Sequence, residues 1–194
     1  MQRYRVDSAQ AARVESLALS LARQLLINVA DEAEQSLHIL SWAARLHEVG
    51  ISVAHSGYHK HSAYILGNAD MPGFSRREQE RLSALTLAHR GAVVKARDCI
   101  TDSMDLALLF ALRLAALFHR CRSDIQLPRL GVRSSNSEFT LFIEPGWLER
   151  NPLTDTALSA EVEQWATLGF KLRVTHEMEG INPSDKATRS TTGA

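Results

Sequence analysis

The sequence predicts a mainly α protein, with an all-helical domain over residues 1–126 followed by a small α+β domain over 127–178. Two patterns lead to this prediction. Apolar residues recur every three or four positions until about residue 122, as on one face of a helix. From Pro128 onward they alternate with polar residues, as in a half-buried strand. Residues 179–194 are mostly small, polar or charged, and we expect a disordered tail there.

The first two helices are expected over residues 8–27 and 32–49. Asp7 or Ser8 would cap the first helix, because a side-chain oxygen there can accept a hydrogen bond from a free backbone N–H group. Gly50 is predicted to end the second helix, since glycine readily adopts the left-handed conformation found at helix ends.

Three more helices complete the predicted helical domain. A short one is expected over residues 61–66, stopped by the glycine that follows. Ser75 and Glu78 form a capping-box pattern that begins the next helix, which should continue to about residue 91. The helix expected over 103–122, with an aspartate as its cap, is apolar on almost every face, which predicts that it is buried.

The C-terminal part is predicted to contain three strands and one helix. Alternating residues on both sides of the polar segment 134–137 indicate a β-hairpin with a four-residue turn. An amphipathic helix is expected over 156–168 and a third strand over 170–174. Such a small core would be unstable alone, so we expect it to pack on the helices.

Composition bounds the function. Lys and Arg together number 22, as do Asp and Glu, so no net charge attracts a polyanion and any anion site must come from local clustering. Cys99 and Cys121 lie apart in helix-like surroundings, and we expect reduced core thiols of a cytosolic protein. No apolar run reaches the length of a membrane span and no signal-peptide pattern begins the chain. We therefore predict a cytoplasmic protein with no membrane partner.

A histidine-rich stretch over residues 46–66 is the first place to look for a site. It contains four of the eight histidines, namely His47, His55, His59 and His61. Titratable groups where two apolar helices meet are costly to desolvate unless they bind something or pair with one another.

Four motifs in order, LHEVG, HSGYHKHSAYIL, DMPGF and AHRG, carry a resemblance. From Tyr4 to about His176 the chain resembles the C-terminal half of the exopolyphosphatase / guanosine pentaphosphate phosphohydrolase family, a half that is itself similar to HD-domain phosphohydrolases. The resemblance implies a degenerate HD-like helical domain. It also implies a fragment, cut from the N-terminal pair of actin-like domains that hold the catalytic site and work with magnesium, and it implies a homodimer.

The same resemblance assigns an HD ligand set, which this sequence does not keep. Of its four positions, only His47 is unchanged: Glu48 stands for aspartate, and Gln10 and Ala116 stand for histidine and aspartate. His47 and Glu48 are therefore interpreted as a vestigial HD site, and no metal is expected in the HD manner. A different metal site built from the four histidines of residues 46–66 remains an alternative. Histidines hydrogen-bonded to backbone or carboxylate are the simpler interpretation.

Phosphate binding is the hypothesis that the charges favour. Between residues 54 and 97 the sequence has seven Lys and Arg against three Asp and Glu. The matching surface for a linear polyphosphate is a row of basic side chains, as for a nucleic-acid backbone. The predicted phosphate-binding residues are His55, His59, Lys60, His61 and Arg90. The other arginines of the segment, Arg76, Arg77, Arg81 and Arg97, are predicted to form an ordinary solvated face.

No catalytic residue is expected in this chain. It lacks a Gly-x-Ser-x-Gly elbow, a Walker-type loop and a cysteine beside a histidine at a helix start. Glu48 could serve as a base, but an ion pair or hydrogen bond with Arg90, His89 or His61 is the commoner fate of such a group. The three tryptophans lie in apolar patterns and are predicted to pack in the core, so no nucleic-acid partner is expected.

The function predicted from the sequence is thus a polyphosphate-binding and dimerisation region. The parent enzyme would be an exopolyphosphatase that removes terminal phosphate from inorganic polyphosphate, with its catalytic half missing here. The alternative is an autonomous HD-type metal phosphohydrolase acting on nucleotides or on guanosine penta- or tetraphosphate. A third reading is a dimerisation module without a ligand.

Overall fold

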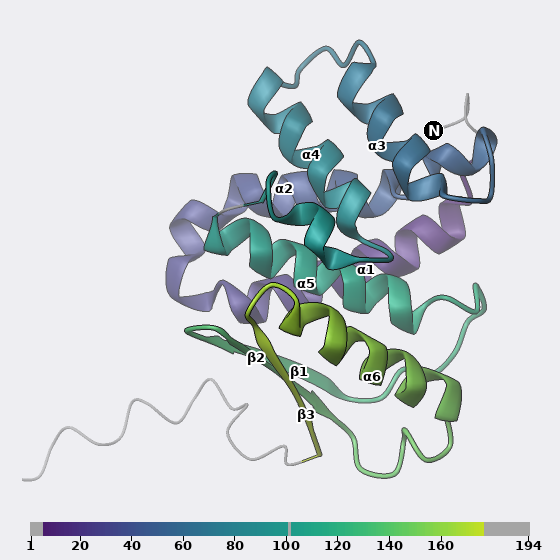
Figure 1. The fold of residues 1–194 in the computed structure, drawn as a ribbon, viewed down its shortest axis with the longest axis vertical. Coiled ribbons are helices and arrows are strands. Elements are labelled where there is room, and N and C mark those ends of the chain that lie inside the picture. Colours follow the sequence, from purple (N-terminus) through teal and green to yellow (C-terminus); the bar gives the residue numbers. More distant parts are fainter. Residues whose placement is uncertain (1–5, 101, 177–194) are drawn as a thin grey trace, which may run out of the picture.

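Figure 1 shows the fold in a computed structural model, which describes residues 6–100 and 102–176. The described helices and strands confirm a mainly α part followed by a small α+β part. The tail expected over 179–194 lies outside the described residues. The elements are α1 (Ser8–Leu25), α2 (Ala30–Leu46), α3 (Tyr58–Asn68), α4 (Arg76–Ala88), α5 (Ser103–Phe118), β1 (Leu130–Ser135), β2 (Glu138–Ile143), α6 (Pro152–Ala166) and β3 (Lys171–Thr175), with short 3-10 helices η2 (Ile27–Val29), η3 (Val49–Ser52) and η4 (Val93–Ala96).

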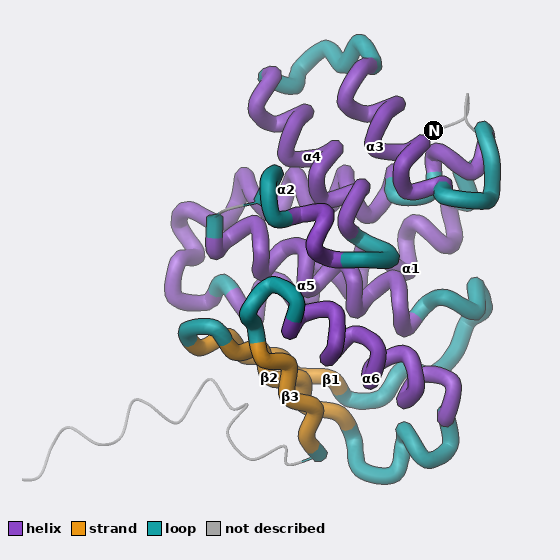
Figure 2. Tube along the Cα trace, in the orientation of Figure 1, coloured by secondary structure: helices purple, strands orange, loops and turns teal. Residues whose placement is uncertain are grey.

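Helix α5 is the centre of the molecule. Helices α1, α2 and α4 pack against it, and α6 and the sheet lie along its other side (Figures 1 and 2). Eleven of its sixteen residues are buried, as its apolar sequence predicts. Phe110 of α5 stacks on Phe139 of β2 with ring centroids 4.3 Å apart, and Trp165 of α6 makes edge-to-face contacts with both rings. The α+β part therefore packs on the helices through a shared core.

The sheet has the order β1-β2-β3. Strands β1 and β2 form the expected antiparallel hairpin, while β3 runs parallel to β2 because α6 makes the crossover between them. The turn is shorter than the four residues expected: Ser134 pairs with Phe139 and Ser135 with Glu138, which leaves only Asn136 and Ser137 between the strands. Asn136 has a positive φ of 50°, a conformation that asparagine tolerates better than most residues.

The helix starts follow their predicted caps. Asp7 accepts from the Gln10 amide, Asp102 accepts from the Met104 amide, and both bonds of the Ser75–Glu78 capping box are present. Helix α3 is longer than expected, beginning at Tyr58 and continuing through the glycine at 67. The two cysteines are free but exposed, so the prediction that they are core thiols was wrong. Among the described residues, no helix is long and apolar enough to cross a membrane.

Gly50 does not end α2 in the predicted way. The helix already ends at Leu46, and Gly50 lies in η3 without a positive φ. Glycine is required instead for close approach, because a Cβ at this position would collide with the Tyr58 carbonyl oxygen and the Ser62 amide of α3. Ser62 Oγ accepts from the Gly50 amide at 2.8 Å and donates to the His47 carbonyl at 2.9 Å. The start of α3 is thereby held against the end of α2.

We expect Gly50→Ala to lower the free energy of unfolding by about 1–3 kcal/mol, the usual cost of overpacking a tight contact. Urea denaturation followed by circular dichroism measures it. Gly67→Ala is the matched control: its Cβ would lie 3.3 Å from the flexible Ser83 hydroxyl, and we expect a change below about 1 kcal/mol. Equal stability of the two variants would contradict the close-approach argument.

Candidate functional site

A pocket of about 600 Å³ opens where the ends of α2, α4 and α5 meet α6 and the start of α3. All four positions of the HD ligand set that the resemblance implies, Gln10, His47, Glu48 and Ala116, line this pocket. They come from two helices, α1 and α5, and from the turn after α2, and are separated by up to 106 positions in sequence. The remaining lining residues are Ile51, His55, Tyr58, His89, Arg90, Gly91, Arg113, Leu117, Arg120, Arg122, Ala157, Ala160 and Glu161.

Two buried histidines form the floor of the site. His47 Nδ1 lies 2.6 Å from the Ala44 carbonyl and His89 Nδ1 lies 2.6 Å from the Thr86 carbonyl, so both rings donate from Nδ1 and carry their lone pair on Nε2. The rings lie nearly perpendicular with centroids 5.2 Å apart. Burial lowers the pKa of His47, and burial together with the neighbouring His47 lowers the pKa of His89 well below the ordinary value. Both imidazoles are therefore neutral at pH 7.

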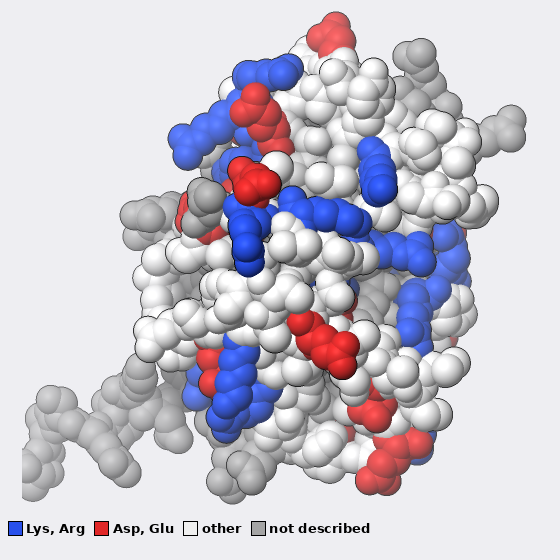
Figure 3. Space-filling view, viewed as in Figure 1, with Lys and Arg blue, Asp and Glu red and all other residues white. Residues whose placement is uncertain are grey.

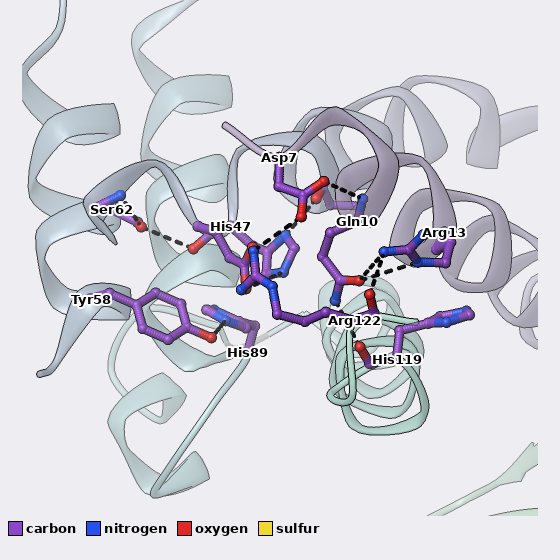
Figure 4. Close-up of polar contacts among 12 residues, drawn as sticks. Asp7, Gln10, Arg13, His47, Tyr58, Ser62, His89, His119 and Arg122 are labelled. Atoms are coloured by element: carbon purple, nitrogen blue, oxygen red, sulfur yellow. Dashed lines mark hydrogen bonds and ion pairs between the residues drawn. The ribbon is translucent and has the colours of Figure 1, made fainter. Parts of the chain in front are cut away.

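Glu48 is committed to an ion pair. Arg122 Nη1 donates to Glu48 Oε1 at 2.8 Å, and His47 Nε2 lies 3.8 Å from the same oxygen. The partners suggested by the sequence, Arg90, His89 and His61, are not the ones observed. Arg122 also reaches Asp7 at 3.4 Å (Figure 4), and its backbone has a positive φ of 56°. Glu48 therefore lacks the freedom expected of a general base.

Arg113 is a buried cation that the sequence analysis missed. It projects from α5 and is only 2% exposed. Its guanidinium donates to the carbonyls of Ala88, the last residue of α4, and of Gly91, and to both oxygens of Glu161 on α6 at 2.8 and 2.6 Å. The one signal in the sequence is a single arginine within the apolar run LLFALRLAALF. Such a residue must find partners, because an unpaired buried charge is costly.

The pocket has an excess of positive charge. Its lining holds four arginines and two glutamates, and each glutamate is already paired, Glu48 with Arg122 and Glu161 with Arg113. Arg90 and Arg120 form no ion pair with a carboxylate of the described residues, and both are exposed. Figure 3 shows a band of Lys and Arg side chains across this face, on the side of α6 nearer to α3 and α4. An anion entering the pocket would meet two guanidinium groups that have no carboxylate partner among the described residues.

The structure divides the predicted phosphate-binding residues. His55 and Arg90 line the pocket, and Arg90 lies over the Tyr58 ring at 5.2 Å. His59, Lys60 and His61 are on α3 outside the pocket lining. Their binding of phosphate stays a prediction.

The structure confirms some of the other predicted roles and contradicts one. Arg81 is not part of a simple solvated face, because it forms a part-buried ion pair with Asp105. Trp147 and Trp165 are buried, and Trp42 packs partly buried against the core, as predicted.

The donor set of the pocket does not fit a divalent metal. Ala116 has no donor atom, the Gln10 amide is occupied by the His119 carbonyl and Arg13, and the Arg122 guanidinium sits on Glu48. Across the described ranges, no group of three or more His, Cys, Asp or Glu side chains is arranged to hold a metal ion.

Fold and pocket together define a mainly α domain with a basic pocket. A family model described as "Ppx/GppA phosphatase, domain III" matches residues 1–162. The chain belongs to the Ppx/GppA phosphatase family, as its motifs predict, and is similar to the C-terminal part of those proteins.

Three relatives named guanosine-5'-triphosphate,3'-diphosphate pyrophosphatase illustrate the match. The protein of Pseudoalteromonas translucida (strain TAC 125) is 37% identical over 177 residues, which cover 90% of this chain and 36% of the relative. That of Pseudoalteromonas atlantica (strain T6c / ATCC BAA-1087) is 32% identical, covering 89% and 35%. That of Vibrio cholerae serotype O1 (strain ATCC 39541 / Classical Ogawa 395 / O395) is 29% identical, again covering 89% and 35%. The chain thus spans about a third of the length of these relatives.

The buried histidines generate a pH prediction. The unfolded chain binds protons at His47 and His89 below about pH 6.5, whereas the folded chain, with lowered pKa values, binds fewer protons there at the same pH. The free energy of unfolding should therefore be fully retained above pH 6.5 and should fall by roughly 2 kcal/mol or more between pH 7 and pH 5. Urea denaturation at pH 7, 6 and 5 measures the fall.

His89→Asn removes one titrating group while its amide can still donate to the Thr86 carbonyl, so we expect a shallower dependence on pH. His38→Asn, at an exposed position of α2, is the control and should follow the wild type. If the His89 variant loses stability as steeply as the wild type, His89 does not carry the effect.

Proposed function

We propose that this chain is the phosphate-binding region of a Ppx/GppA-type phosphohydrolase, and that its pocket holds phosphate groups of a polyanionic substrate such as inorganic polyphosphate. The observation that carries the proposal is the charge balance of the pocket: two glutamates neutralise two arginines, and Arg90 and Arg120 remain without a carboxylate partner among the described residues. Arginine suits this task because its planar donors match phosphate oxygens.

We propose that the chemistry takes place elsewhere in the parent protein. Hydrolysis of the terminal phosphoanhydride, with magnesium, would belong to N-terminal actin-like domains, and this region would hold more distant phosphates of the same substrate. A substrate held at a second place stays bound between cleavages, which raises the effective concentration of the next scissile bond. We further propose a cytoplasmic homodimer, in which helical faces outside the pocket make the contact between subunits.

Guanosine-5'-triphosphate,3'-diphosphate is the second candidate ligand, because the relatives named above carry it in their names. It offers the same phosphate chemistry on a nucleoside. Competition between this nucleotide and polyphosphate for the isolated chain separates the two: the preferred ligand displaces the other at the lower concentration.

An autonomous metal phosphohydrolase is the rival function. It requires a ligand set that Ala116 and the Arg122–Glu48 ion pair disfavour. Stoichiometric manganese or zinc in the purified chain, together with phosphate release from nucleotides, would favour this rival over the proposed function.

Replacing Arg90 and Arg120 together by alanine should weaken binding of long polyphosphate by about 150-fold or more at low salt, since hydrogen bonds to charged groups contribute about 1.5–3 kcal/mol each. Titration at two salt concentrations should also give a shallower salt dependence, because two fewer counterions are released on binding. Fluorescence anisotropy of labelled polyphosphate measures both effects.

Arg76→Ala with Arg77→Ala is the matched control. It makes the same change in net charge on exposed positions of α4 that do not line the pocket. We expect less than about a threefold loss from this screened surface charge. Equal losses in the two double variants would indicate general electrostatic attraction and would overturn the pocket as the binding site.

The segment His59, Lys60 and His61 gives an independent prediction. If the phosphate chain continues from the pocket along α3, joint replacement of the three residues by alanine should weaken long polyphosphate more than it weakens tripolyphosphate. The same titrations with both ligands measure the difference. An equal effect on both lengths would remove these residues from the proposed path.

A further inference from the structure

A lysine and a histidine meet beside the pocket without belonging to its lining. Lys95 Nζ, on η4, lies 3.0 Å from His59 Nε2, on α3. The two side chains are partly buried, and a Cβ at Gly91 would lie 3.2 Å from the same Nζ, so the amine is held against the backbone. No carboxylate of the described residues forms an ion pair with Lys95.

The charges around this pair all have the same sign. Burial, Lys95, Lys60, Arg90 and Arg113, in that order, lower the pKa of His59 to about 4. Its Nε2 can therefore accept the hydrogen bond from Lys95 Nζ at neutral pH. Burial, and after it Lys60 and Arg113, lower the pKa of Lys95 below its ordinary value. A lysine in such surroundings spends more of its time as the neutral amine, which is the nucleophilic form.

We propose that Lys95 is an acylation site that reacts with acyl phosphates, with His59 as the residue that orients its amine. The hydrogen bond from Nζ to His59 fixes one N–H and leaves the nitrogen lone pair directed elsewhere. The neighbouring cations Lys60 and Arg90 attract the phosphate group of the reagent and bring its acyl carbon to the amine. Among the described residues, no carboxylate opposes that approach through an ion pair with Lys95.

The reaction needs only the amine and the acyl phosphate. The Nζ lone pair forms a bond to the acyl carbon, and the bond from that carbon to the phosphate oxygen breaks with its electron pair on the oxygen. The proton lost by Nζ ends on the phosphate, which leaves as hydrogen phosphate. The products are an amide at Lys95 and one positive charge less beside the pocket. A resulting loss of polyanion affinity would rest on the proposed function, whereas the modification itself does not.

Acetyl phosphate is the probe, and the sequence supplies internal controls. Lys60 is exposed among the same cations, and Lys171 is exposed on β3 at 3.9 Å from Glu138. After incubation of the full chain at pH 8, peptide mass spectrometry gives the initial rate at each lysine. We expect Lys95 to be acetylated at least about fivefold faster than Lys60 and Lys171, since its surroundings favour the neutral amine. Equal rates at the three lysines would overturn the proposal.

Two variants test the role of His59. His59→Phe keeps an aromatic ring beside Tyr58 and His89 but removes the acceptor. We expect it to abolish the faster acetylation of Lys95, while Lys60 and Lys171 react as before. His59→Gln restores an acceptor oxygen and should recover part of the difference in acetylation rate. Circular dichroism and urea denaturation show whether each variant is folded. If Lys95 is still acetylated as much faster than the control lysines in the folded His59→Phe variant, His59 does not orient the amine. Because the readout is the modified lysine, failure here is distinguishable from failure of polyphosphate binding.

Discussion

One buried guanidinium, that of Arg113, sets the arrangement on which the pocket depends. In the apolar surroundings of α5 an unpaired charge would cost several kcal/mol, so the partners must come to it. They come from two sides: the carbonyls that follow α4 and the carboxylate of Glu161 on α6. This side chain therefore joins the helical part to the α+β part. It also fixes the chain at Gly91, next to the exposed Arg90, so a stability constraint in the core places a charged group at the pocket.

The pocket shows how a chain with no net charge can still present a basic site. Its six arginine and glutamate side chains come from distant segments, and the ion pairs Arg113–Glu161 and Arg122–Glu48 neutralise four of them. These pairs are partly or wholly buried and resist screening by salt more than surface pairs do. The two remaining side chains, Arg90 and Arg120, are exposed and positively charged.

How far the sequence predicts this molecule depends on the range of the interactions. The caps of Asp7 and Ser75 and the hairpin were predictable because they are local patterns. The joining of Gln10, His47 and Ala116 in one pocket followed only from a resemblance to known proteins. The Arg122–Glu48 pair spans 74 positions, and no local pattern distinguishes this arginine from others of the chain. Gly50 was recognised as special for the wrong reason, since the approach of α3 to its backbone is a tertiary contact.

Arg122 combines an unusual backbone conformation with two ion pairs at the pocket. A non-glycine residue at φ 56° costs on the order of 1 kcal/mol, and such strain persists where the surroundings over-determine it. Here the surroundings are Glu48 and Asp7, which both accept from the guanidinium. The four positions that the HD resemblance singles out, Gln10, His47, Glu48 and Ala116, all line this pocket. The Arg122 guanidinium lies against Glu48, Ala116 has no donor atom, and the Gln10 amide is already hydrogen-bonded. These contacts favour the proposed binding of a polyanion over metal-assisted hydrolysis in this pocket.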